Sequence, residues 1–439
     1  MTDDPTSPDE PGQITRRRVL GGAAALGSAL AVGTSGVGRA AAAVVGKPSD
    51  PRVDPARSGI EHVVVVMMEN RSFDHMLGWL PGANGIQAGL SFVDHEGVTH
   101  PTWHLDTFQG LQYGDPDHSY NGGRIQLDRG RCDGWLQAGT DDVFPIGYYE
   151  ADDLDFYSQA APYWTVCDHF HASIMGPTFP NRMYMHAAQT DRISNTFTPS
   201  TLPAIWDSLA AAGVSGRYYY ADVPVIALFG SKFLPISFPY AQFLTDCAAG
   251  DLPSVTYIDP RFIGESTGTA GDDHPFADVR VGQAFLNEIY TAVTNGPDWD
   301  STVLVITYDE WGGFFDHVVP RAGADNDPTH ALRGFRVPTF VISPFARRHH
   351  IAHELYDHTS ILAMIEWRWG LPPLTPRDAH AVNLARTLAF HTPPDLTAPQ
   401  WEVPAADTIT AKASLGGPTE HEREFAGIAE LAAAHGFPV

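Results

Sequence analysis

One apolar run constrains the fold of this chain more than any other feature. Residues 63–68 read Val-Val-Val-Val-Met-Met, and Glu69 and Asn70 follow directly. A β-branched run of this length is typical of a strand that is buried on both faces of a parallel sheet. Ligands bind outside the carboxyl ends of such strands. The stretch therefore predicts oxygen ligands at the mouth of a site, although Glu69 and Asn70 would also suit the start of a helix.

A second stretch repeats this arrangement. Residues 302–308 (TVLVITY) form another apolar run, and Asp309 and Glu310 come directly after it. From residue 201 onward the chain alternates helix and strand, which predicts an α/β fold with a mostly parallel central sheet and helices on both faces. The expected elements are helices at 202–212, 281–293 and after Asp357, and strands at 163–167, 217–220, 255–258 and 337–342.

A hydroxyl group lies between these strands in the sequence. Thr178 belongs to residues 176–182 (GPTFPNR), where the second proline predicts a helix that begins at Pro180 or Asn181. Free N–H groups at a helix N-terminus favour an anion. Thr178 is therefore placed either to attack a phosphoryl group or only to cap the helix.

The strand ends and the threonine together predict a metal site. Glu69, Asn70, Thr178, Asp309 and Glu310 all offer oxygen, which implies a hard or borderline divalent cation. Calcium, magnesium, manganese and zinc are not distinguished. The ion would bind the threonine oxygen, lower its pKa and hold a phosphoryl oxygen. No histidine cluster stands at these strand ends, so we expect one ion and not two.

These motifs resemble those of the bacterial phospholipase C and acid phosphatase family of phosphoesterases, to which plant non-specific phospholipases C belong. The fold of that family is similar to alkaline phosphatase and the sulfatases. Four stretches between residues 60 and 345 carry the resemblance in the family's order: 69–75 (ENRSFDH), 176–182 (GPTFPNR), 309–318 (DEWGGFFDHV) and 334–345 (GFRVPTFVISPF).

The resemblance implies roles for individual residues. It makes Thr178 the nucleophile, which would form a phosphothreonine that water then hydrolyses. His274 or His317 would protonate the leaving group. His118 and Arg182 would hold the non-bridging phosphate oxygens, and His274 is also a candidate for phosphate binding.

Two positions depart from related patterns. The family usually has a histidine where this chain has Trp311. Residues 178–182 also match the spacing of the sulfatase signature, but Thr178 cannot become the formylglycine that sulfatases use. Hydrolysis of sulfate esters is therefore disfavoured.

The N-terminal residues 1–43 read as a twin-arginine export signal. Arg16, Arg17 and Arg18 precede a weakly apolar run, and small residues end it near Ala43. Glycines interrupt that run, which disfavours a membrane anchor. We expect a secreted or cell-envelope protein, which the twin-arginine export machinery carries across the membrane.

The charge of the chain limits its partners. Acidic and basic residues cancel within 1–43, so residues 44–439 keep the formal charge of −25. Such acidity opposes nucleic-acid binding, which needs basic patches. The same acidity disfavours binding to anionic membranes, but it is compatible with peripheral contact with a zwitterionic membrane. Export would permit one disulfide among Cys132, Cys167 and Cys247, and the sequence does not choose the pair.

The remaining chain divides into a catalytic domain at 44–395 and a C-terminal tail at 396–439. The resemblance does not cover this tail, in which a short helix is expected around 422–434. An irregular insertion at about 80–163 would form one wall of the cleft. The aromatic residues of this region suit either a lipid-facing rim or a second core; they are Trp79, Phe92, Trp103, Phe108, Tyr113 and Tyr120.

These observations favour a phospholipase C that hydrolyses phospholipids of the phosphatidylcholine type to diacylglycerol and a phosphorylated head group. An acid phosphatase that acts on small soluble esters would use the same residues. A non-catalytic, exported metal-binding protein is a third alternative, and the presence of Thr178, Asp309 and Glu310 argues against it.

Overall fold

The two apolar runs lie side by side at the centre of an eight-stranded sheet. In the computed structural model, β1 (His62–Met68) and β11 (Thr302–Tyr308) pair in parallel, with His62 opposite Thr302 and Met68 opposite Tyr308. Burial on both faces explains why both strands read as uninterrupted apolar sequence. Because the strands are in register, the residues that follow them leave the same edge of the sheet.

The sheet is mostly parallel, as predicted. Its strand order is β13-β6-β12-β11-β1-β10-β8-β9, and β12 alone among these strands runs antiparallel to its neighbours. The other strands of this sheet are β6 (Thr165–Cys167), β8 (Gly216–Tyr220), β9 (Ser237–Pro239), β10 (Val255–Asp259), β12 (Phe340–Ile342) and β13 (His350–Ala352).

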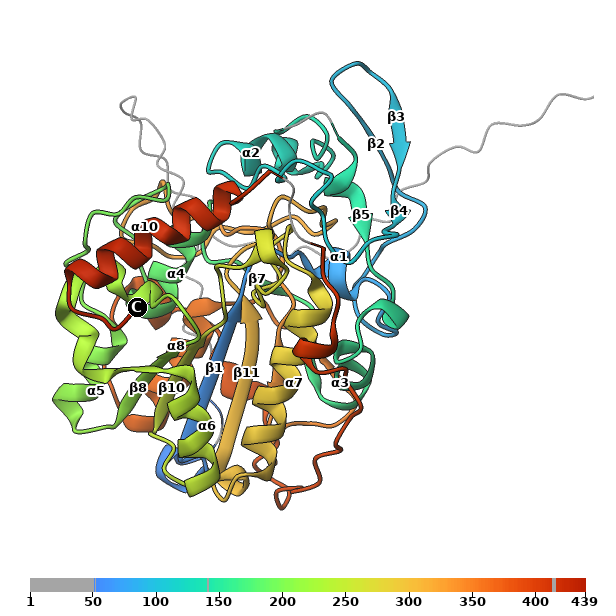
Figure 1. Ribbon diagram of the computed structural model, residues 1–439. Coiled ribbons are helices and arrows are strands. Elements are labelled where there is room, and N and C mark those ends of the chain that lie inside the picture. Colours follow the sequence, from blue (N-terminus) through green and yellow to red (C-terminus); the bar gives the residue numbers. More distant parts are fainter. Residues whose placement is uncertain (1–50, 52, 140–141, 413–415) are drawn as a thin grey trace, which may run out of the picture. The chain divides into compact units, whose positions relative to one another are not determined.

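Helices cover both faces of the sheet (Figure 1). On one face, α6 (Tyr240–Ala249) packs against α7 (Val279–Asn295), and on the other α4 (Thr178–Ala187) packs against α8 (His358–Trp369). The predicted α/β class with helices on both faces is therefore confirmed.

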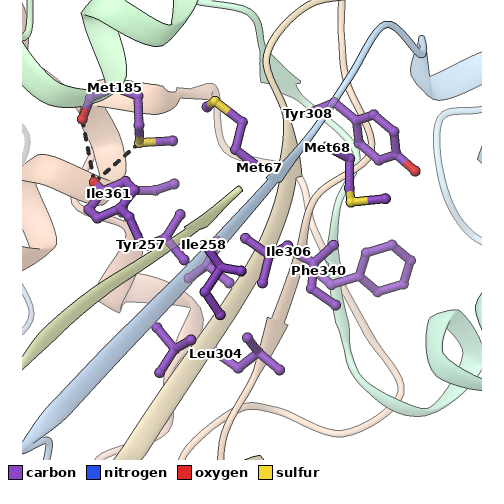
Figure 2. Close-up of a cluster of buried hydrophobic side chains, with 14 of the residues drawn as sticks. Met67, Met68, Met185, Tyr257, Ile258, Leu304, Ile306, Tyr308, Phe340 and Ile361 are labelled. Carbon is purple, nitrogen blue, oxygen red and sulfur yellow. Dashed lines mark hydrogen bonds between the residues drawn. The ribbon is translucent and has the colours of Figure 1, made fainter. Parts of the chain in front are cut away.

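The core of the α4–α8 face lies against the ends of the central strands (Figure 2). Met185 of α4 and Ile361 of α8 pack beside Met67 and Tyr257 of the sheet. The Tyr257 hydroxyl donates a hydrogen bond to the Met185 carbonyl over 3.4 Å. This packing fixes α4, and with it Thr178, relative to the carboxyl ends of β1 and β11.

The predicted start of α4 is wrong by two or three residues. The helix begins at Thr178 itself, after Pro177 as its N-cap. Pro180 is tolerated in the first turn because the N–H that it lacks would have no partner within the helix. Thr178 is consequently the first helical residue and does not precede the helix.

The remaining α-helices and strands surround the sheet, and all of them except α10 are short. They are α1 (Phe73–Leu77), α2 (Gly122–Leu127), α3 (Tyr157–Tyr163), α5 (Ile205–Ala212), α9 (Pro376–Ala379), α10 (Glu420–Ala434), β2 (Ser91–Val93), β3 (Thr99–Pro101), β4 (Trp103–His104), β5 (Gly147–Tyr148), β7 (Phe170–His171) and β14 (Tyr356–Asp357).

Among the aromatic residues singled out around the 80–163 region, Phe92 is buried and most of the others pack, partly buried, against the cores. A second buried cluster joins Phe92 and Trp135 to Trp311 and Phe335. Trp79, Trp103, Phe108 and Tyr113 pack against the buried clusters, and Tyr120 lies against the Arg124 guanidinium at 3.4 Å from its ring centroid. The second-core interpretation thus holds for Phe92 and for Trp103, which packs against the same cluster.

The structure describes residues 51, 53–139, 142–412 and 416–439. The predicted export signal at 1–43 lies outside this range. Within it, none of the helices combines the length and the hydrophobicity that a bilayer crossing needs. Cys132, Cys167 and Cys247 are buried free thiols, so the structure shows no disulfide among these three cysteines.

Candidate active site

A polar cavity of about 330 Å³ lies beyond the carboxyl end of β1. It brings together residues that are far apart in the sequence and includes four predicted site residues. Its lining consists of Asn70, Asp115, Pro116, Asp117, His118, Ser119, Pro177, Thr178, His274, Glu420, His421 and Glu424. A larger cavity of about 800 Å³ between α6 and α7 has mostly apolar walls and includes none of these residues.

Thr178 lies at the inner wall of this cavity. The residue is 2% exposed, and its Oγ1 donates a hydrogen bond to Glu69 Oε1 over 3.2 Å. Pro177 is the N-cap of α4, so the threonine hydroxyl does not cap the helix. The geometry therefore favours a reacting hydroxyl over the capping interpretation, and the N-terminus of α4 favours negative charge beside it.

The residues after β1 turn sharply toward the cavity. Asn70 has a φ of +59°, a left-handed conformation that asparagine tolerates better than most residues. Its N–H donates to Asp309 Oδ1 over 3.1 Å, which ties the two strand ends together. Helix α1 begins later, with Ser72 as its N-cap, so Glu69 and Asn70 are not capping residues. Gly312 passes so close that a Cβ atom there would lie 2.1 Å from the Asn70 carbonyl oxygen.

The predicted metal ligands leave buried oxygen atoms without partners. Glu69 Oε2, Asn70 Oδ1 and Glu310 Oε1 are buried and accept no hydrogen bond. Such atoms are costly unless something satisfies them. Burial raises the pKa of Asp309 to about 7 and that of Glu310 well above its ordinary value, and neighbouring acidic groups add to both shifts. A divalent cation would satisfy the free oxygens and relieve the repulsion between the acidic groups, so Glu69, Asn70 and Glu310 fit such an ion.

Arg182 lies behind these carboxylates and not at the cavity. Its Nε donates to Asp309 Oδ2 over 2.9 Å and its Nη1 to Asp259 Oδ1 over 3.2 Å. Its Nη2 donates to the Met68 carbonyl over 3.3 Å. Because these donors are engaged inside the protein, the structure does not place Arg182 to hold a phosphate oxygen. It instead offsets the negative charge at the strand ends.

Two of the predicted histidines face the cavity. His118 Nδ1 contacts the Pro116 carbonyl at 2.8 Å, which leaves Nε2 near Asn70 Nδ2 at 3.4 Å. His274 Nδ1 bonds the Glu265 carboxylate, and its Nε2 lies 3.5 Å from Asp115.

His274 is held in its protonated form. Burial and His421 oppose protonation, but the Glu265 and Asp115 carboxylates outweigh them and raise the pKa of His274 to about 10. His274 is therefore a proton donor near neutral pH.

His317 lies elsewhere, although the sequence motif singled it out. Its Nδ1 bonds Asp74, and its Nε2 lies 3.0 Å from Asn84 Oδ1. Asp74 also accepts a hydrogen bond from Arg336 over 2.9 Å, and Arg336 in turn pairs with Asp316. This network ties the motifs at 69–75, 309–318 and 334–345 to one another. His317 is not among the residues that line the cavity.

The structure adds residues that the sequence did not reveal. His421 of α10 lies 3.3 Å from Glu69 Oε1 and stacks on His274, with 3.8 Å between ring centroids. In the described part of the chain, two buried groups place possible ligand atoms within 4.8 Å of one another; these are Glu265, His274 and His421, and Glu69, Asp272 and His421. Glu69, Asp309 and Glu310 do not form such a group among the described residues. The sequence did not reveal these two groups, because their members lie far apart in the chain and no motif spacing connects them.

Sequence similarity assigns this arrangement to a known class. The chain belongs to the Phosphoesterase family, whose model matches residues 60–372. It is 31% identical over 433 residues to phospholipase C B of Mycobacterium tuberculosis, which covers 80% of this chain and 81% of that protein. It is also 31% identical over 391 residues to non-specific phospholipase C1 of Arabidopsis thaliana, covering 78% and 73%. The protein is therefore a hydrolase that acts on phosphoric esters, as the resemblance predicted.

Solved structures are more distant. The lipoteichoic acid synthase LtaP from Listeria monocytogenes is 10% identical, with a TM-score of 0.43 and coverage of 89% of this chain and 95% of that chain. A member of the alkaline phosphatase superfamily from Vibrio parahaemolyticus is also 10% identical, with a TM-score of 0.35 and coverage of 78% and 72%. These TM-scores are too low to carry an argument, and the fold class rests on the sheet itself.

Proposed function

We propose that this protein is an exported, metal-dependent phospholipase C that cleaves phospholipids of the phosphatidylcholine type through a phosphothreonine at Thr178. One observation carries this proposal: a buried threonine hydroxyl at a helix N-terminus donates to Glu69 beside a polar cavity. The phospholipases C among the relatives support the substrate class.

The residues suggest a reaction in two steps. Thr178 Oγ1 attacks phosphorus while its proton passes to Glu69, and the departing alcohol takes a proton from His274. Water then attacks the phosphothreonine, gives its proton to His274 and releases Thr178, which recovers its proton from Glu69. His118 Nε2 faces the cavity, where it would contact the non-bridging oxygens.

The proposed cofactor is one divalent ion. Glu69, Asn70, Thr178, Asp309 and Glu310 would hold it, and it would supply positive charge for the attacking and phosphoryl oxygens. The unpartnered oxygens of Glu69, Asn70 and Glu310 support this assignment.

The charge of the cavity favours a cationic head group. Asp115, Asp117, Glu420 and Glu424 line its walls. Carboxylates around a site attract a cationic ligand such as choline and repel the second negative charge of a phosphomonoester. This favours phosphatidylcholine over the small soluble monoesters of an acid phosphatase, which remains the alternative.

A substrate panel separates these two functions. We expect kcat/KM to be at least about 10-fold higher for phosphatidylcholine and p-nitrophenyl phosphocholine than for p-nitrophenyl phosphate. Repulsion between two like charges at a protein surface costs on the order of 1 to 4 kcal/mol, and about 1.4 kcal/mol corresponds to a tenfold rate difference. Initial rates with and without chelator provide the measurement. The opposite order would identify an acid phosphatase.

Export is tested separately in the cell. Replacing Arg16, Arg17 and Arg18 with lysine should leave the precursor inside, because the twin-arginine route reads paired arginines and not charge alone. Immunoblots of cell and culture fractions measure the distribution. The matched control is Arg39→Lys, which lies after the apolar run. Unchanged secretion of the triple variant would show that the signal is of another kind.

A further inference from the structure

The C-terminal helix contributes to the candidate active site. The family match ends at residue 372, and α10 (Glu420–Ala434) follows it by almost fifty residues of chain. Nevertheless, Glu420, His421 and Glu424 form part of the cavity wall. Figure 1 shows α10 across the end of the sheet near α4.

The first two turns of α10 are anchored to the loop around Glu265. Glu422 Oε1 accepts hydrogen bonds from the Gly264 N–H over 3.0 Å and the Ser266 N–H over 3.2 Å. Phe425 stacks on Phe262, with 4.2 Å between ring centroids. These contacts fix the helix against the loop that carries Glu265, so the position of His421 is determined by packing.

His421 lies among three buried carboxylates and is itself 3% exposed on its side chain. Its Nε2 is 3.3 Å from Glu69 Oε1 and 3.8 Å from Asp272 Oδ2, and its Nδ1 is 3.5 Å from Glu265 Oε1. Neither ring nitrogen has a hydrogen-bond partner of good geometry. The ring thus touches both the acceptor of the Thr178 hydroxyl and the carboxylate that orients His274.

Glu69 is held from two sides. His421 approaches Oε1, the same oxygen that accepts from Thr178, while Arg182 Nη2 lies 3.7 Å from Oε2. The ring face of His421 also stacks on His274 at an interplanar angle of 15°, which limits the rotation of His274. Loss of the imidazole would free two side chains that the proposed reaction needs in one geometry.

We propose that His421 is a positioning residue, supplied by the C-terminal helix, which holds Glu69 against Thr178 and orients His274 toward the cavity. This inference rests on the proposed function of Thr178 and Glu69. It makes α10 a structural part of the active site, although α10 lies outside the stretch that defines the family.

The test compares His421→Ala and His421→Gln with Glu430→Gln, an exposed position on the same helix. We expect His421→Ala to lower kcat about 10- to 100-fold and to weaken manganese binding by a similar factor, with little change in KM, because residues that orient ligands have effects of this size. His421→Gln should recover part of both losses, since the glutamine amide has an N–H that can contact Glu69 from the same side. Titration calorimetry with manganese gives the readout besides activity.

Two results would overturn the inference. One is wild-type kcat and manganese affinity in the folded His421→Ala or His421→Gln protein. The other is two bound ions in the wild type and one in His421→Ala, which would make His421 a metal ligand and not a positioning residue. Failure of the proposed function looks different, because Thr178→Ala would then keep its activity whatever happens at His421.

Discussion

Replacing Thr178 with alanine is expected to lower kcat by roughly 10⁴- to 10⁶-fold, as loss of the nucleophile does in other hydrolases with a covalent intermediate. The alanine side chain cannot attack phosphorus, so no phosphothreonine can form. The fold should persist because Pro177 and not Thr178 caps α4, and because only one side-chain hydrogen bond, to Glu69, is lost. Thermal unfolding measures whether the fold persists. Single-turnover rates on p-nitrophenyl phosphocholine measure the loss of activity.

The matched variant is Thr178→Ser. It keeps a hydroxyl at the same position on α4, so we expect measurable turnover at a reduced rate. The reduction arises because serine lacks the methyl group that restricts the rotamer of threonine. Near-normal rates in the alanine variant would rule out Thr178 as the nucleophile.

Removal of the metal is the second large effect that we expect. Chelation should lower the rate by about 10³-fold or more, because charge stabilisation at a reacting oxygen is worth several kcal/mol. Re-addition of calcium, magnesium, manganese or zinc should restore it to different extents and so identify the ion. Metal analysis of the purified protein should find one ion per chain. A metal-free preparation that works at full rate would contradict the proposal, as would two ions.

The Asp309→Asn variant tests whether a predicted ligand accounts for the dependence of activity on the metal. The amide removes one negative charge beside Glu310 and weakens the contact with Arg182 Nε. We expect metal affinity and activity to fall together, by about 100-fold, since a first ligand should matter at least as much as the residues that orient it. The control is Asp300→Asn, an exposed aspartate outside the cavity. Activity lost without any change in metal affinity would assign Asp309 another role.

The sequence predicted the centre of the fold because the physical signal is local there. Strands buried on both faces need apolar side chains at every position, so β1 and β11 appear as uninterrupted runs. The register of β1 and β11 places Asp309 beside Asn70. The predicted convergence of these strand ends therefore follows from the parallel pairing of the two strands alone. The sequence does not define the start of α4 to the residue, because proline is compatible with several positions in a first turn.

Side-chain partners could not be predicted in the same way. His317 stands in a family motif, but a motif does not state which residue the side chain contacts, and Asp74 lies over two hundred residues earlier. Arg182 was expected at the phosphate, yet the carboxylates behind the site engage its donors. The partners of both side chains are set by tertiary packing, which no spacing of residues along the sequence encodes.

His421 shows this limit most clearly. It follows Thr419 and Glu420 at the start of an ordinary amphipathic helix, and nothing nearby marks it as part of a site. Its contact with Glu69 joins residues at opposite ends of the chain. Only the path of the C-terminal segment over the sheet brings them together.

The identity of the nucleophile is the central claim, and one measurement addresses it directly. The wild-type protein is mixed with p-nitrophenyl phosphocholine, quenched in acid within the first turnover and digested for peptide mass spectrometry. We predict a phosphocholine or phosphoryl group on the peptide that contains Thr178, at that residue, and none in Thr178→Ala. A modified group at another residue, or an unmodified protein under conditions where a burst of p-nitrophenol is seen, would contradict the account.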